Sequence, residues 1–216
     1  MKIIANIGKG GGGKSTIAAN LATVAAGRGL SVCLLDADPQ SSLCQWRAVR
    51  QTGDIKVVRC EGTVRARVKE AANAGIDWLI IDTAPELGEH TLEAVRIADF
   101  VLIPGRPANF DLAVTKQRVE LLLTTGRAFT IVVNDAPPRR RRREAPLVRE
   151  TREALLNIGG RLWDGQITHR VAIIYALLNG QSVLEFAPDS PAVDEYIGLW
   201  DHIVRKVGEA HHDQAA

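Results

Sequence analysis

The stretch MKIIANIGKGGGGKST at residues 1–16 decides the fold. An apolar run of strand length, residues 3–7, precedes four glycines that lie between Lys9 and Lys14, and a segment of helical period follows. The glycines fit the spacing GxxxxGK[ST], which binds phosphate when it joins a strand to a helix. We therefore predict a phosphate-binding loop in which Lys14 reaches the β- and γ-phosphates and the Ser15 hydroxyl is a Mg²⁺ ligand.

Glycines suit such a loop because they tolerate positive φ and allow backbone N–H groups to approach a polyphosphate closely. The N-terminus of the following helix also favours an anion. The predicted nucleotide contacts in the loop are Gly10, Gly11, Gly12, Gly13, Lys14, Ser15 and Thr16.

Short apolar runs alternate with amphipathic segments along the rest of the chain. The predicted strands are residues 3–7, 32–35, 56–60, 78–81, 100–103 and 130–133. The predicted helices follow the glycine loop and then occupy residues 43–50, 64–74, 91–98 and 112–123. Apolar strands separated by such helices predict a doubly wound α/β fold, with a mostly parallel sheet covered by helices on both faces.

Length and composition limit the classes of protein. The chain has 216 residues, enough for one sizeable core, and we predict a single domain over residues 1–209 with a disordered tail at 210–216. Its 27 Lys and Arg against 25 Asp and Glu give a net charge of +2, so a nucleic-acid partner must meet a local basic patch. The three cysteines show no metal-binding or disulfide spacing.

No apolar run reaches the ~20 residues that span a bilayer, and the first residues carry no signal-peptide pattern. These features predict a soluble, cytoplasmic protein.

Carboxylates end two of the predicted strands. Asp36 and Asp38 in LLDADPQSS lie two residues apart and hence on one side of an extended chain, and Asp82 ends the run WLIID. Open α/β sheets bind ligands at the carboxyl ends of their strands, so all three are candidates for the site. The alternative for Asp36 and Asp38 is that they cap the next helix.

With these motifs, the chain resembles the ParA/MinD family of P-loop ATPases. KGGGGKST is similar to the family's deviant Walker A pattern KGGxGK[ST], LDADPQ to its DxDPQ segment, and DTAPELG to its DxxPxLG pattern. The C-terminal segment ITHRVAIIYALLNGQSVLEFAPDSPAVDEY also matches, so the resemblance runs from about residue 3 to about residue 207. Gly12 stands where the family often has a larger residue, and we expect it to loosen the loop.

The resemblance implies ATP and Mg²⁺ as cofactors and gives roles to particular residues. Lys9 would reach the phosphates of a partner subunit in an ATP-bound homodimer, although a solvated Lys9 is the alternative. Lys9, Lys14 and Asp38 would be catalytic, Asp38 by orienting the attacking water. Asp82 would hold Mg²⁺ through water and Asp36 would support it from the outer shell, while Asn134 would contact adenine.

Two features bear on the branch of the family. Arg170 stands where ParA proteins carry an arginine implicated in DNA contact, with a salt bridge as the alternative. A basic run could meet DNA phosphates or an acidic partner, or it could remain solvated, and it consists of Arg139, Arg140, Arg141, Arg142 and Arg143. The last predicted helix has an apolar stripe from Val193 to Val207 that fits a core helix, which disfavours membrane anchoring.

The resemblance therefore implies a ParA-like ATPase that dimerises on ATP·Mg²⁺, binds DNA nonspecifically and hydrolyses ATP when a ParB-like or other adaptor stimulates it. Such a protein would be nucleoid-associated and would segregate plasmid or chromosomal DNA or position a cellular cargo. The alternatives are a MinD-like membrane-associated regulator and a dethiobiotin synthetase-like metabolic enzyme.

Overall fold

The computed structural model describes residues 1–109, 112–141 and 143–215. Within them, the strands form one six-stranded sheet in the order β3-β2-β4-β1-β5-β6, and every pair of neighbours is parallel. The strands are β1 Lys2–Asn6, β2 Val32–Ala37, β3 Lys56–Arg59, β4 Trp78–Thr83, β5 Phe100–Gly105 and β6 Phe129–Val133. The predicted doubly wound α/β fold is confirmed, and each predicted strand is present with both ends within two residues of the predicted positions.

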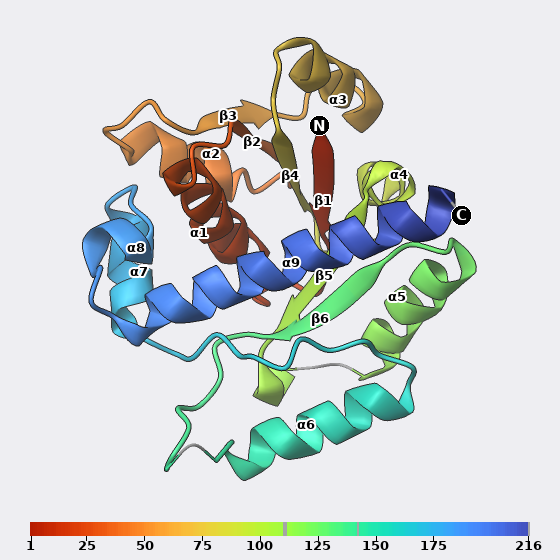
Figure 1. Ribbon diagram of the computed structural model, residues 1–216, viewed down its shortest axis with the longest axis vertical. Helices are drawn as coiled ribbons and strands as arrows, with labels where there is room; N and C mark the ends of the chain where they lie inside the picture. Colours follow the sequence, from red (N-terminus) through yellow and green to blue (C-terminus); the bar gives the residue numbers. More distant parts are fainter. Residues whose placement is uncertain (110–111, 142, 216) are drawn as a thin grey trace.

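The helices lie on both faces of this sheet (Figure 1). They are α1 Lys14–Gly27, α2 Ser42–Val49, α3 Val64–Asn73, α4 Glu89–Ile97, the 3₁₀ turn η1 Pro107–Asn109, α5 Leu112–Thr124, α6 Pro146–Asn157, α7 Val171–Leu178, α8 Val183–Phe186 and α9 Pro191–Ala215. Sequence analysis did not predict α6, α7 or α8.

Alternation along the strands divides the core into two layers. Ile4 and Ile80 point to the face that α1, α7, α8 and α9 cover, whereas Ile3 and Ile81 point to the face that α3, α4 and α5 cover. All of these strand residues are buried, as expected for a parallel sheet between two helical layers.

Helix α9 lies beside α1 across one face of the sheet (Figure 1). Tyr196, Trp200, Ile203 and Val207 of the predicted stripe are fully buried, which confirms that this helix packs on the protein's own core. The backbone of α9 continues through Ala215, so no break in secondary structure marks residue 209. The domain boundary and the disorder of residues 210–216 stay predictions.

Removing the Trp200 side chain tests the contribution of α9 to stability. Its ring is fully buried and lies 4.7 Å, centroid to centroid, from the ring of Trp78. Trp200→Ala should lower the free energy of unfolding by about 3–5 kcal/mol, measured by urea denaturation, because it leaves a large cavity. Leu156→Ala on the exposed side of α6 is the control and should change it by less than about 1 kcal/mol.

Candidate nucleotide-binding site

The glycine loop joins β1 to α1 at the carboxyl edge of the sheet. Gly13 is the N-cap residue of α1 and has a left-handed φ of 89°. A Cβ on Gly13 would lie 2.1 Å from Nδ2 of Asn134. That Nδ2 instead donates to the Gly12 carbonyl at 2.9 Å. Only glycine fits at residue 13, because both the φ value and the approach of Asn134 exclude a side chain.

Lys14 is drawn into the loop, and only 6% of its surface is exposed. Its Nζ donates to the Gly8 carbonyl at 3.3 Å, and its backbone carbonyl accepts from Asn6. Burial lowers the pKa of Lys14, although Asp82 and Asp38 act to raise it. The loop thus holds a partly desolvated cation, as the predicted phosphate contact requires.

Asp82 and Ser15 meet behind the loop, where the Ser15 hydroxyl donates to Oδ2 of Asp82. Asp82 ends the apolar run of β4 and is fully buried, and burial raises its pKa to about 7 against the opposing effects of Ser15 and Lys14. Its Oδ1 has no hydrogen-bond partner among the described residues. A buried carboxylate oxygen in this position is suited to a cation or to water bound to one.

This donor set fits Mg²⁺. The ion is commonly held by one or two protein oxygen ligands together with water and substrate phosphates, rather than by an all-protein cage. In the described part of the chain, the Ser15 hydroxyl and the Asp82 carboxylate lie together and supply two such oxygens.

Asp36 lies opposite Asp82 in the β2–β4 register, but its carboxylate faces α2. It accepts from the backbone N–H of Cys44 at 2.9 Å and of Asp38 at 3.3 Å. The structure therefore shows for Asp36 the helix-capping contact that was the alternative, and its support of Mg²⁺ stays a prediction. The Asp38 carboxylate accepts from the Gln40 N–H at 2.9 Å.

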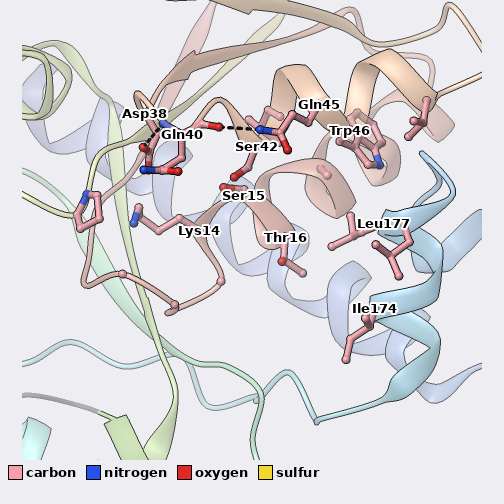
Figure 2. A pocket seen from close by; sticks show the side chains of 18 of the residues that line it. Lys14, Ser15, Thr16, Asp38, Gln40, Ser42, Gln45, Trp46, Ile174 and Leu177 are labelled. Atoms are coloured by element: carbon pink, nitrogen blue, oxygen red, sulfur yellow. Dashed lines mark hydrogen bonds between the residues drawn. The ribbon is translucent and has the colours of Figure 1, made fainter.

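A cleft of about 670 Å³ opens beside the loop. Figure 2 shows Lys14, Ser15 and Asp38 toward one end and the apolar side chains of Ile174 and Leu177 toward the other. The cleft thus combines a charged end on the glycine loop with an apolar end between α2 and α7.

The two apolar walls are tied together. The indole Nε1 of Trp46 on α2 donates to the carbonyl of Gln181 at 3.1 Å. The buried guanidinium of Arg50, just after α2, pairs with Glu185 of α8 at 2.7 Å and donates to the Gly180 carbonyl at 3.0 Å. It also pairs with Asp54 at 2.9 Å. These contacts hold the end of α2 against the turn between α7 and α8.

Gly12 differs from the sequence-based expectation of a looser loop. A Cβ at Gly12 would lie 2.6 Å from the carbonyl oxygen of Pro104 in β5, so the loop packs closely there and has no room for a larger residue. Lys9 is exposed at the start of the loop, and its carbonyl accepts from the Gly12 N–H at 3.3 Å. Its contact with a partner subunit stays a prediction.

Arg106, which follows β5, lines the cleft, and Asn134, which follows β6, contacts the glycine loop. Asn134 is buried against the glycine loop, and its contact with adenine stays a prediction. The adjacent Asp135 carboxylate pairs with Arg106 at 3.1 Å and with His169 at 2.5 Å. Arg106 was not predicted from the sequence to be a site residue, although it lines the cleft.

The predicted DNA contacts lie outside the cleft. Arg170 pairs with Glu195 at 2.7 Å, which is the salt bridge weighed as the alternative to DNA contact. Arg139 pairs with Glu144 at 3.1 Å. Arg140, Arg141 and Arg143 are exposed on a tight turn closed by backbone hydrogen bonds between Arg140 and Arg143, whereas Arg142 lies outside the described residues. Contact of these arginines with DNA stays a prediction.

Comparison with protein families gives a match over residues 3–184 to the CobQ/CobB/MinD/ParA nucleotide binding domain. The chain is similar to the "Maintenance of carboxysome distribution protein A" of Halothiobacillus neapolitanus, with 26% identity over 211 residues that cover 93% of this chain and 94% of that protein.

Two solved structures share the fold. Apo McdA from Cyanthece superposes with a TM-score of 0.76 at 16% identity, covering 97% of this chain and 99% of that one. A putative plasmid partition protein from Borrelia burgdorferi bound to AMPPNP has a TM-score of 0.72 at 17% identity, covering 95% of this chain and 99% of that one.

The buried Asp82 should make the stability of the nucleotide-free protein depend on pH. Its pKa is raised in the folded state, so the stability that its protonated form contributes is complete below pH ~4 and is lost as the pH rises toward 7. From pH 5 to pH 8, wild type should lose roughly 2–3 kcal/mol relative to Asp82→Asn in urea denaturation. Parallel pH profiles for the two proteins would contradict this.

Proposed function

Because the chain belongs to the CobQ/CobB/MinD/ParA family of nucleotide-binding domains, we propose that it is a ParA-type ATPase that cycles between an ATP-bound dimer and a dissociated state and binds DNA nonspecifically as the dimer. The observation that carries this proposal is the convergence of Lys14, Ser15 and Asp38 on one cleft that Asp82 backs. Lys9 is exposed at the start of the glycine loop, which supports the dimeric part of the proposal.

Nucleotide binding follows from the loop. Lys14 and the backbone N–H groups at the start of α1 would bind the phosphates, and Ser15 and Asp82 would hold Mg²⁺. An ion held there would supply positive charge against the charge that develops on the phosphates. Asp38, which lines the cleft near Lys14, orients the water that attacks the γ-phosphate, and Lys9 and Lys14 stabilise the transferred phosphoryl group.

An exposed apolar surface next to the cleft supports dimerisation. Four side chains on the outer side of α7 are each more than half exposed, and we call them the α7 patch: Val171, Ile174, Tyr175 and Leu178. Contiguous exposed apolar surface commonly marks an interface. Ile174 and Leu178 also line the cleft, so the patch continues directly from the nucleotide site. A second copy that delivers Lys9 to this site would cover the patch at the same time.

DNA binding is assigned to the exposed arginines outside the cleft. Arg140, Arg141 and Arg143 are available to phosphates, and two-fold symmetry would double their number in the dimer. Arg170 would contact DNA only with the part of its side chain that Glu195 leaves exposed. The resulting protein would be associated with the nucleoid.

The cellular role that we propose for this ATPase is partition of DNA or positioning of a cargo. The similarity to a carboxysome distribution protein over most of both chains supports that class of role. An adaptor protein would stimulate hydrolysis. Membrane attachment through α9 is disfavoured because the apolar stripe of this helix is buried in the core. No helix in the described residues is long and apolar enough to cross a bilayer.

The dimer is tested with Lys9→Ala and Leu178→Glu, which remove the proposed trans contact and place a charge in the α7 patch. Each should weaken ATP-dependent dimerisation at least about tenfold in sedimentation experiments, because an unpaired buried charge is costly in an interface and Lys9 would no longer reach the partner's phosphates. Leu156→Glu alters another exposed leucine, on α6, and should dimerise as wild type does. Unchanged dimerisation of both test variants would contradict the proposed interface.

DNA binding is tested in an Asp38→Ala background, which should retain the ATP state. We expect this protein to bind an arbitrary duplex with ATP and not with ADP, and to bind less tightly as salt rises. Replacing Arg140, Arg141 and Arg143 by Gln should reduce the slope of log K against log salt by about 0.9 for each phosphate that the variant no longer neutralises.

Arg65→Gln, on the exposed side of α3, is the matched control and should leave that slope unchanged. Absence of DNA binding with both ATP and ADP would contradict the DNA-binding part of the proposal. The next experiments would then measure binding to lipid vesicles and turnover of small-molecule substrates.

A further inference from the structure

Helix α5 carries a buried arginine that has no part in the mechanism proposed for the nucleotide site. Arg118 is 4% exposed and shares the inner face of α5 with Thr115, Val119 and Leu122. A guanidinium in such a position is costly unless its N–H groups find acceptors. One amino group of Arg118 donates to the carbonyl of Pro85 at 2.5 Å, and the other donates to the carbonyl of Val114 at 3.0 Å.

The Pro85 contact reaches the nucleotide site. Pro85 follows Asp82 by three residues, in the loop that joins β4 to α4, and it lines the cleft. A Cβ placed on Gly10 would lie 3.6 Å from Cγ of Pro85, so the Pro85 ring lies beside Gly10 of the glycine loop. Arg118 therefore holds, through the Pro85 carbonyl, the same residue whose ring meets Gly10.

The charge of Arg118 is also felt at Lys14. Arg118 lies with Lys9, Gly10 and Pro104 around a recess of about 20 Å³ behind the glycine loop. It acts to lower the pKa of Lys14, as a neighbouring cation does. A positive charge close enough to affect Lys14 is close enough to attract the phosphates that Lys14 would bind, because both side chains are buried and screening by water is weak.

We propose that Arg118 is a positioning residue of the nucleotide site, which locks the loop of Pro85 against the glycine loop through its hydrogen bonds and adds a second buried positive charge behind the phosphates. The inference rests on the proposed ATPase activity but not on DNA binding or dimerisation. It assigns α5 a part in catalysis without contact with the nucleotide.

Two variants separate the two effects. Arg118→Met removes both the charge and the hydrogen bonds, so it should raise the Kd for Mg²⁺·ATP about tenfold and lower the single-turnover rate of ATP hydrolysis about 10- to 100-fold. Arg118→Lys keeps the charge but cannot bridge the Pro85 and Val114 carbonyls. Its Kd should stay within about threefold of wild type, while its rate falls as in Arg118→Met.

Arg127 provides the matched control, because its guanidinium also donates to two backbone carbonyls, those of Arg96 and Ala98, and it does not line the cleft. Arg127 is less buried than Arg118, so Arg127→Met should lower the thermal midpoint by a smaller amount, and it should leave the Kd and the hydrolysis rate unchanged. Equal Kd values and rates for these two variants would make Arg118 purely structural and overturn the proposal.

If Arg118→Met does not fold, Arg118→Lys decides the matter, since a wild-type hydrolysis rate in that variant would overturn the locking role. These measurements use no DNA. If the Asp38→Ala protein does not bind DNA in the presence of ATP, the proposed DNA-binding function is contradicted and the role of Arg118 is not. If the wild-type protein does not bind ATP, both proposals are contradicted.

Discussion

The parallel pairing of β4 with β1 and with β2 is the constraint on which the rest of the molecule depends. Since parallel strands bring all of their carboxyl ends to one edge, Asn6, Asp36 and Asp82 come into register there. The glycine loop leaves β1 at that edge, and Asn134 reaches it from β6. A change in strand order would separate these groups, although each would keep its local sequence.

Buried charge is concentrated at this edge of the sheet. Lys14, Arg118 and Asp82 are all nearly inaccessible to water, and the burial that lowers the pKa of Lys14 also raises that of Asp82. A nucleotide with its metal ion would supply an anion and a cation together. The energetic cost of keeping these groups out of water in the free protein therefore becomes binding energy for a ligand of the right charge pattern.

The sequence predicted the sheet well because each strand is an apolar run bounded by polar residues, and it predicted the loop because spacing and context agree. Helix α7 was missed because VAIIYALL is apolar on every side and so has no helical periodicity, although its outer surface is exposed. Arg118 could have been noticed as a charge three residues from Thr115 on an apolar helix face, but only the fold shows that this face meets Pro85.

The contact between Asn134 and the glycine loop also restricts how this sequence can evolve. Residues 13 and 134 are far apart in the chain, yet any side chain at 13 would occupy the space of the Asn134 amide. Divergence at residue 13 would require a smaller residue at 134, which would remove the hydrogen bond to Gly12, and also a change of the left-handed φ at residue 13. Residue 13 is therefore expected to stay glycine for as long as the loop keeps this conformation, whereas residue 134 can change at the cost of its hydrogen bond to the loop.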